Sequence, residues 1–343
     1  MMYKRYFLWG AGSVGRRILK HLSSLGILEG IIDNDPAKQG QFISGLLISG
    51  YDSIKPLLKD AHIIIAHFGF IETEEILKRD NISFSRFSEF ITEWHWKKNC
   101  QHALGFIDFP VTTRCSLACR DCMQYIPYRT QQDIAFLYLK KQLSSFFSHI
   151  SFVGEMSIIG GEPFLHEYIA ELIAHIGECY AGRVGSLVVT TNGTIIPSSF
   201  MIEQCRKANV FISVSDYSDT LAYSEKITEL EFVVKSGGVK IERKLWNWAD
   251  PGKFNFNYPF KDCGQTHMQL SDEKLWRCTL MAAGYSAGFC EAQSGRDYFD
   301  LSQEKSDELH SFLIDTDFLY RTTQCQKCLY PQKIVVPSAV QLR

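Results

Sequence analysis

Between residues 104 and 217 the sequence repeats one pattern, in which a short apolar run ends at a cluster of small or polar residues. The apolar runs cover 105–113, 155–161, 186–193 and 210–217. Segments with helical periodicity separate them, at about 131–150, 164–178 and 197–207. Such strand–helix units predict a parallel sheet that is curled into a full or partial barrel. Because parallel strands end at one edge of the sheet, we expect the clusters that follow them to form one site.

The chain has 343 residues, which is room for two or three domains. Changes in composition divide it into residues 1–98, 104–255 and 256–343. The last unit begins with many aromatic residues, glycines and prolines and lacks a helical period. We therefore expect an α/β protein, with a small parallel sheet first and a barrel-like unit next. The last unit should be loop-rich and held together by something other than a large apolar core.

Composition argues against two classes of partner. The formal net charge is −2, so no basic surplus favours nucleic acid. No apolar run reaches eighteen residues, so we expect no helix that spans a membrane. The first residues, MMYKRYFLWGAG, lack the apolar stretch and small-residue cleavage site of a signal peptide, and we expect a cytoplasmic protein.

A glycine turn follows the first apolar run, at residues 4–9. Gly10, Gly12 and Gly15 open a helical segment, and Asp33 closes the next apolar run. This order predicts a Rossmann-like unit, in which the glycines approach a pyrophosphate and Asp33 accepts a hydrogen bond from a ribose hydroxyl. The unit also resembles the small domains that precede bacterial acyltransferases acting on nucleotide sugars. Nucleotide-sugar binding, a nicotinamide cofactor and a degenerate docking module all stay open, and the first is narrowly favoured.

Three cysteines lie within eight positions, at Cys115, Cys119 and Cys122. Clustered cysteines in a cytoplasmic chain indicate metal binding or chemistry more often than disulfides. Thiolates are the usual ligands of iron–sulfur clusters, and three of them leave one corner of a four-iron cluster to a small molecule. A zinc site is the alternative, but zinc takes four ligands and does not require the GGEP sequence at residues 160–163.

The C-x-x-x-C-x-x-C spacing followed by GGEP resembles the radical S-adenosylmethionine (radical SAM) enzymes. By this resemblance Cys115, Cys119 and Cys122 hold a [4Fe–4S] cluster in a partial (β/α)6 barrel, and S-adenosylmethionine binds the open iron. One electron from the cluster cleaves the cofactor to a 5′-deoxyadenosyl radical, which takes a hydrogen atom from the substrate. Most members have an aromatic residue before the third cysteine, whereas this sequence has Asp121.

The resemblance also implies which residues contact S-adenosylmethionine. Gly160, Gly161 and Glu162 would lie at the strand edge that receives the methionine amino group, where a carboxylate suits an ammonium. Polar contacts to the ribose and carboxylate would come from the two motifs after the next strands: Asn192, Ser213, Ser215 and Asp216. The alternative for each is an ordinary polar residue at a strand end or helix N-cap.

A second group of cysteines lies in the last unit: Cys263, Cys278, Cys325 and Cys328. Four thiolates complete a closed site for either a zinc ion or a full four-iron cluster, and spacing alone leaves both open. Their order resembles the twitch or SPASM-like unit that holds an auxiliary [4Fe–4S] cluster in some radical SAM enzymes, although Glu273 takes a turn position where these hairpins often have glycine. Residues 338–341 are similar to the tails of such enzymes encoded among bacterial surface-polysaccharide genes.

These resemblances imply a radical SAM oxidoreductase that abstracts hydrogen from a carbohydrate or nucleotide-linked sugar and then oxidises or isomerises it. Such an enzyme needs an electron donor such as flavodoxin or ferredoxin. Epimerisation needs a thiol that returns a hydrogen atom, and Cys290 is the candidate, with an inert thiol as the ordinary alternative. One competing function is a peptide maturase, which needs a peptide-recognition module where this chain has a strand and a glycine turn. The other is a non-catalytic iron–sulfur or zinc scaffold.

Overall fold

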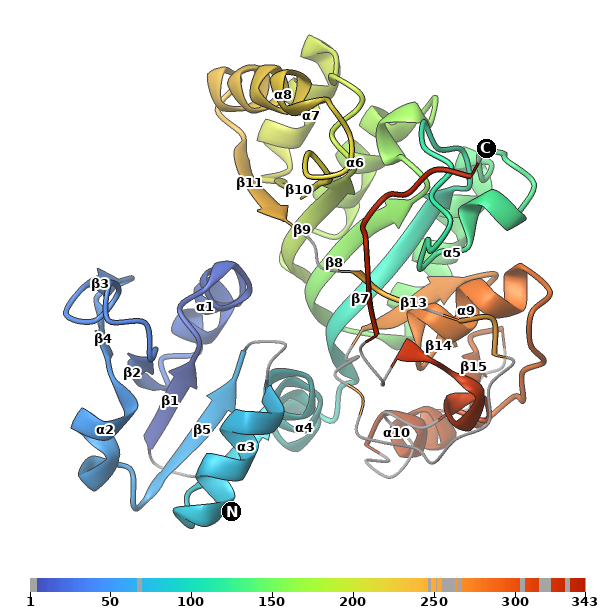
Figure 1. Ribbon diagram of the computed structural model, residues 1–343. Coiled ribbons are helices and arrows are strands. Elements are labelled where there is room, and N and C mark those ends of the chain that lie inside the picture. The colour runs from blue at the N-terminus through green and yellow to red at the C-terminus, as the bar shows by residue number, and fades with distance from the viewer. Residues whose placement is uncertain are drawn as a thin grey trace.

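The computed structural model describes residues 5–66, 70–245, 248–250, 252–254, 263, 267–302, 306–314, 322–330 and 334–342. Within these residues the chain forms two large sheets whose strands are mostly parallel, with helices packed against them (Figure 1). The α/β fold class that the sequence predicts is therefore present.

The first sheet has six strands in the order β3-β4-β2-β1-β5-β6, and only β3 and β4 pair antiparallel. Its strands are β1 (Arg5–Trp9), β2 (Leu28–Ile32), β3 (Phe42–Ile43), β4 (Leu46–Ser49), β5 (Ala61–Ile65) and β6 (Ser83–Arg86). The helices around it are α1 (Ser13–Ser24), α2 (Tyr51–Ile54), the 3-10 turn η1 (Lys55–Leu57), α3 (Phe70–Arg79) and α4 (Phe87–Asn99). The glycine turn joins β1, at the centre of this sheet, to α1.

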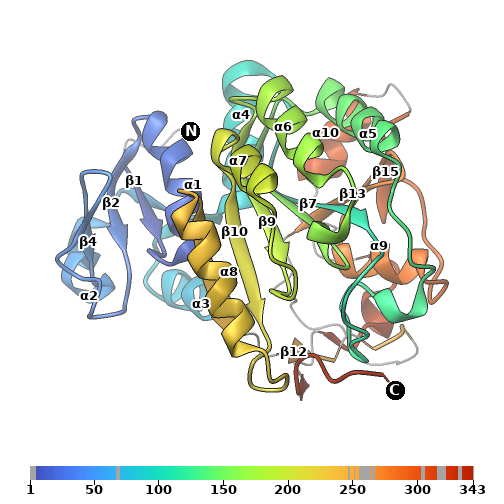
Figure 2. The same ribbon diagram turned by 90° about the horizontal axis from the view of Figure 1, so that it is seen from above.

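The second sheet has eight strands in the order β11-β10-β9-β8-β7-β13-β14-β15, several of which run side by side in Figure 2. Five successive parallel strands build most of it: β7 (Ala103–Thr112), β8 (Phe152–Gly160), β9 (Val184–Thr191), β10 (Phe211–Asp216) and β11 (Lys240–Leu245). The segments between them contain η2 (Ile126–Tyr128), α5 (Phe136–His149), η3 (Pro163–Leu165), α6 (Ile169–Cys179), α7 (Ser199–Lys207) and α8 (Ser224–Ser236).

The last third of the chain extends this central sheet. Its elements are β12 (Trp248–Ala249), β13 (Met268–Ser271), β14 (Lys274–Trp276), α9 (Thr279–Ser286), β15 (Tyr298–Asp300), α10 (Ser306–Ile314), η4 (Cys325–Lys327) and β16 (Val335–Val336). β13 pairs in parallel with β7, and β14 and β15 follow it antiparallel. The sixth parallel strand thus lies beside the first of the five and not after the fifth.

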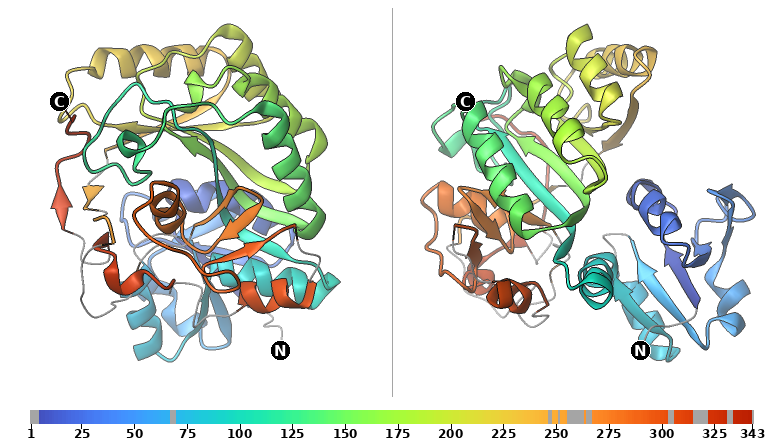
Figure 3. Two further views of the ribbon diagram at one scale, coloured as in Figure 1. Left: turned by 90° about the vertical axis from the view of Figure 1, so that its right-hand side faces the viewer. Right: turned by 180° about the vertical axis from the view of Figure 1, so that it is seen from behind.

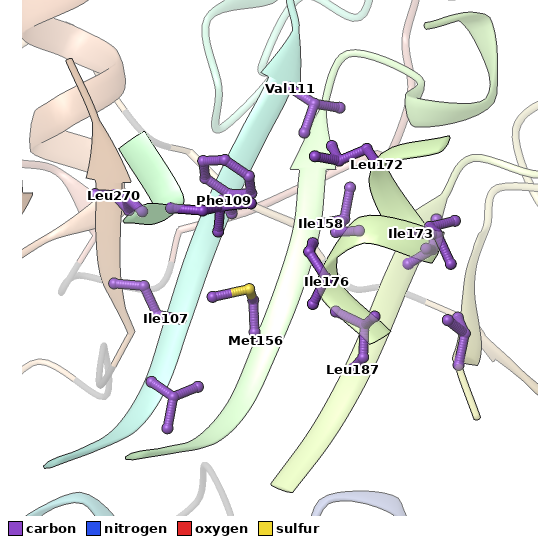
Figure 4. Packing of buried hydrophobic residues seen from close by; sticks show 14 of the residues in the cluster. Ile107, Phe109, Val111, Met156, Ile158, Leu172, Ile173, Ile176, Leu187 and Leu270 are labelled. Carbon is purple, nitrogen blue, oxygen red and sulfur yellow. The ribbon is translucent and has the colours of Figure 1, made fainter. Parts of the chain in front are cut away.

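The two faces of the central sheet differ in polarity because side chains alternate along a strand. Ile107, Phe109 and Val111 of β7 belong to the apolar cluster under α5 to α8, as do Met156 and Ile158 of β8 (Figure 4). The same cluster includes Leu270 of β13 and Phe312 of α10. This corrects one expectation, because Leu270, Leu275 and Phe299 of the last unit share the large apolar core of the central unit.

The two sheets are joined by apolar contacts around α4, which lies between them in Figure 3. Phe87 and Phe90 of α4 belong to one buried cluster with Phe106 of β7 and Phe152 of β8. His21 of α1 stacks on Phe152, with the ring centroids 3.9 Å apart. The first sheet therefore packs against the central sheet through buried rings as well as through the covalent link.

None of the helices in the described part of the chain has the length and hydrophobicity needed to cross a membrane.

Candidate active site

The loop that contains Cys115, Cys119 and Cys122 begins directly after β7 and packs against the end of β8. We call it the three-cysteine loop, or the cysteine loop for short. A Cβ atom built on Gly160 would lie 2.3 Å from the carbonyl oxygen of Thr112, and one built on Gly161 would lie 2.1 Å from that of Arg114. Gly160 also has a φ of 148°, which favours glycine. Gly160 is therefore required by the close approach of the end of β7 and Gly161 by that of the cysteine loop, whereas the sequence suggested an approach to the cofactor. Their contact with S-adenosylmethionine stays a prediction.

Glu162 is fully buried and joins the ends of β8 and β9. Its carboxylate accepts hydrogen bonds from Thr191 Oγ1 at 2.9 Å, from the backbone N–H of Asn192 at 2.8 Å and from that of Phe164 at 3.1 Å. Burial raises the pKa of this carboxyl to about 7, and the hydrogen bonds act in the opposite direction. The carboxylate is thus hydrogen-bonded to the backbone and to Thr191 within the protein, and its expected contact with the methionine amino group stays a prediction.

Asn192 brings the end of β9 to the cysteine loop. Its side-chain Nδ2 lies 3.5 Å from Cys115 Sγ and 3.1 Å from Ser116 Oγ, and its Oδ1 accepts from the backbone N–H of Thr194 at 2.9 Å. A backbone N–H, that of Leu117, also donates to Cys115 Sγ at 3.4 Å. The motifs after three neighbouring strands, β7, β8 and β9, thus meet at one edge, as the alternation predicts.

The three residues expected from the end of β10 have different surroundings. Ser213 and Ser215 are buried, and the Ser213 hydroxyl lies 3.5 Å from the Glu242 carboxylate on β11. Asp216 is paired with Arg243 and accepts from the backbone N–H of Ser218 at 2.9 Å. Burial favours the neutral acid, but these partners hold the pKa of Asp216 below its usual value. Their cofactor roles stay predictions.

The donor chemistry of the loop suits an iron–sulfur cluster. Burial is the main cause that raises the pKa of Cys115 to about 12 and that of Cys119 to about 11, and the charges of neighbouring loop cysteines contribute to both increases. Such thiols ionise readily only with a cation beside them. In the described part of the chain no three His, Cys, Asp or Glu side chains converge on one point as they do around a single ion. A four-iron cluster has separate corners, so its ligands need not converge in that way.

The second cysteine group comes together around α9 and η4. Burial is the main reason why the pKa of Cys278 is raised, and the charges of Cys263, Cys328 and Cys325 add to it. Cys278 is the N-cap of α9, and Cys325 Sγ accepts a hydrogen bond from the backbone N–H of Thr322 at 3.0 Å. The four thiols are thus electrostatic neighbours, while the choice between zinc and an auxiliary cluster stays a prediction.

Cys290 lies beside this second group. It packs in one apolar cluster with Cys278, Cys328 and Tyr125, and burial raises its pKa to about 12. Tyr125, which the sequence analysis missed, follows the first cysteine loop and donates from its hydroxyl to the carbonyl of Gly252 at 2.8 Å. Its buried ring packs with Cys278 and Cys328 of the second group, and a tyrosine three positions after Cys122 carries no pattern that would reveal this.

The glycine turn of the first unit forms as the sequence predicts, but Asp33 stabilises it from within. Asp33 Oδ2 accepts from the backbone N–H of Ala11 at 2.8 Å, and Lys38 Nζ lies 3.2 Å from the same carboxylate. Gly10 has a φ of 123°, and a Cβ atom on Gly15 would lie 1.8 Å from the Gly10 carbonyl oxygen. Gly12 has nothing within 4 Å of its Cβ position. The ribose contact of Asp33 stays a prediction.

Sequence reasoning also missed a set of buried polar residues on the face of the central sheet opposite the apolar core. His267 Nδ1 lies 3.0 Å from Asp108 Oδ1, and Arg17 of α1 pairs with Glu155 of β8. Burial alone would lower the pKa of His267, but the Asp108 carboxylate raises it. Each partner comes from a different part of the chain, so no local pattern announces the pairs.

No family model and no curated protein matches the chain. Among solved structures it is similar to SuiB of Streptococcus suis bound to S-adenosylmethionine, at 17% identity and a TM-score of 0.32, over 50% of this chain and 37% of SuiB. BtrN in complex with AdoMet and 2-DOIA gives 13% identity and a TM-score of 0.43, over 69% of this chain and 96% of BtrN. Methylornithine synthase, PylB, gives 13% and 0.29, over 50% of each chain.

These three neighbours are radical SAM enzymes. The chain covers well under half the length of SuiB. All three TM-scores lie below 0.5, so the likeness by itself assigns no activity.

Proposed function

We propose that this chain is a radical SAM enzyme in which Cys115, Cys119 and Cys122 hold a [4Fe–4S] cluster that binds S-adenosylmethionine. The observation that carries the proposal is the meeting of three motifs at one sheet edge. The end of β7 and the cysteine loop pack on Gly160 and Gly161 so closely that no side chain fits, and Asn192 contacts Cys115 Sγ at 3.5 Å. The bound cluster and cofactor would supply the 5′-deoxyadenosyl radical.

The polar face of the central sheet supports a hydroxylated substrate, such as a carbohydrate or nucleotide-linked sugar. Asp108 and Ser157 line this face on β7 and β8, and Ser213 and Ser215 continue it on β10, whereas the Glu155 carboxylate is already held by Arg17. Carboxylates and hydroxyls of this kind form the hydrogen bonds that sugar hydroxyls require. The buried pair of His267 and Asp108 is the best-placed group on this face for holding a hydroxyl proton, because the carboxylate orients the imidazole.

The second cysteine group would hold an auxiliary cluster that accepts the electron released when a substrate radical is oxidised. Cys278 and Cys328 pack in one cluster with Tyr125, which follows the first cysteine loop, and the charges of Cys263 and Cys325 act on Cys278. A reductant such as flavodoxin or ferredoxin would supply the first electron. The glycine turn of the first unit would bind the nucleotide part of a nucleotide sugar.

Anaerobic reconstitution with iron and sulfide tests the first step of this proposal. The reconstituted chain should contain two four-iron clusters and should release 5′-deoxyadenosine from S-adenosylmethionine under reducing conditions. Cys115→Ser should lose one cluster and all cleavage of S-adenosylmethionine. Cys179 is an exposed cysteine on α6, so Cys179→Ser should keep two clusters and full cleavage. Zinc in place of iron, or iron without cleavage, would favour the non-catalytic scaffold.

A panel of nucleotide sugars and free sugars tests the substrate class. Deuterium transfer from a substrate into 5′-deoxyadenosine would identify the compound from which hydrogen is taken. Transfer from a peptide and from no sugar would contradict the carbohydrate proposal and favour a peptide maturase.

A further inference from the structure

Residues 339–342 lie directly on the three-cysteine loop, although more than 200 residues separate the two segments in sequence. Cys119 and Gln341 form an antiparallel bridge. The backbone N–H of Arg120 donates to the Val340 carbonyl at 2.7 Å, and that of Leu342 donates to the Ala118 carbonyl at 2.7 Å. Figure 1 shows this C-terminal segment, in red, reaching the loop that follows β7. We call residues 339–342 the strap.

The Gln341 side chain uses both its acceptor and its donors in this contact. Its Oε1 accepts from the backbone N–H of Ala118 at 2.6 Å. Its Nε2 donates to Cys119 Sγ at 3.4 Å and to the Ala339 carbonyl at 2.6 Å. The Gln341 side chain therefore holds the backbone of Ala118 in place and also donates to the sulfur of Cys119. A side chain that made only apolar contacts would do neither.

The strap is anchored on its other side as well. Ala339 is fully buried, with a φ of 53°, and packs in one cluster with Cys119, Tyr217 and Val336. Val336 belongs to β16, which pairs antiparallel with β12. The strap is thus held between a short sheet and the cysteine loop, and its geometry does not depend on Gln341 alone.

We propose that Gln341 is a positioning residue for Cys119, which orders this part of the loop and donates an N–H···S hydrogen bond to the cluster ligand. The proposal rests on the proposed function, because it requires a cluster at Cys119. Hydrogen bonds to the sulfurs are among the features that set the reduction potential of an iron–sulfur cluster. A donor stabilises the added negative charge of the reduced state, so Gln341 should make the cluster easier to reduce.

Two variants separate the hydrogen bond to sulfur from the ordering of the loop. Gln341→Glu keeps an oxygen that accepts from Ala118 but replaces the donor with a charged acceptor. Gln341→Met has a similar length, no donor and no charge. The matched control is Gln101→Glu, the same substitution at an exposed glutamine between α4 and β7.

The measurement is the midpoint potential of the first cluster in the anaerobically reconstituted full chain, with the iron content determined on the same sample. Gln341→Glu should shift the reduction equilibrium at least tenfold toward the oxidised cluster, which is about 59 mV lower for one electron. Gln341→Met should move it in the same direction by a smaller amount, and Gln101→Glu should leave it unchanged. Should the glutamate variant not load iron, the methionine variant decides.

Full iron content with unaltered potentials in both Gln341 variants would overturn this inference and leave the proposed function intact. A wild-type chain that takes up no iron would overturn both. Hydrogen exchange on the iron-free chain gives an independent readout of loop order. The Ala118 amide should exchange faster in Gln341→Met, whereas the Arg120 amide, which donates to a backbone carbonyl, should change less.

Discussion

The guanidinium of Arg17 on α1 donates two hydrogen bonds to the carboxylate of Glu155 on β8, from Nε at 2.6 Å and from Nη2 at 3.1 Å. A third nitrogen, Nη1, donates to Glu242 on β11 at 2.8 Å. Glu155 is only 2% exposed. Helix α1 of the first unit therefore supplies the positive charge that neutralises the buried carboxylates on the polar face of the central sheet.

Replacing Arg17 by methionine should destabilise the chain by about 3 to 5 kcal/mol, because a buried carboxylate is left without its cation. Chemical unfolding followed by circular dichroism measures this change. Lys20→Met, at an exposed position of the same helix, is the control and should change the free energy of unfolding by about 0.5 kcal/mol or less. Equal stabilities of the two variants would show that the ion pair contributes nothing.

Acid should weaken the contact between the two sheets. Burial, and secondarily the charge of His95, lowers the pKa of His21 to about 4, while an unfolded histidine has a pKa near 6.5. The unfolded chain therefore binds more protons between these values, so the stability present above pH 6.5 is lost as the pH falls toward 4. Because the ring is partly exposed, the stability lost through His21 on acidification to pH 5 should be about 1 to 2 kcal/mol.

Urea unfolding at pH 7.5 and pH 5 tests this expectation. His21→Phe keeps a ring against Phe152 but removes the titrating group, so it should lose less stability on acidification than the wild type. Other buried histidines, such as His62, remain in both proteins, and only the difference between the two proteins belongs to His21. The same pH dependence in both would refute the assignment.

Gly161→Ala should impair iron uptake by the three-cysteine loop. The added methyl group would lie 2.1 Å from the Arg114 carbonyl oxygen and 2.9 Å from Cys115 Cβ, so the loop must move. Overpacking of this kind costs about 1 to 3 kcal/mol. Iron content and the absorption of the cluster after reconstitution measure the effect, and Gly12→Ala, with open space around it, serves as the control.

The glycine turn of the first unit allows a test by neighbouring substitutions. Gly15→Ala places a methyl group 1.8 Å from the Gly10 carbonyl oxygen and should destabilise the first sheet, by about 1 to 3 kcal/mol. Gly12→Ala meets no atom, so it should cost only the loss of a favourable N-cap residue, about 1 kcal/mol or less. Thermal unfolding of both variants compares them. A tolerated Gly15→Ala would mean that the turn is looser than the contact requires.

Part of the candidate site could be predicted from sequence because its members are local motifs at strand ends. The Cys115 loop, Gly161 and Asn192 each follow an apolar strand, and parallel pairing brings them to one edge. Asp216 and Asp33 illustrate the limit of this reasoning. Their positions suit a ligand contact, but Arg243 and Ala11 bind their carboxylates within the protein, and nothing in the local sequence indicates those partners.

The sequence by itself determined the alternation of strands and helices, the glycine turn after β1 and the spacing of both cysteine groups, because these depend on residues a few positions apart. Only the tertiary structure decided that β13 lies beside β7, that Arg17 pairs with Glu155, and that Gln341 contacts Cys119. These contacts join segments that are far apart along the chain. Such contacts are selected by the packing of whole sheets and by the need to pair buried charge, which no short stretch of sequence encodes.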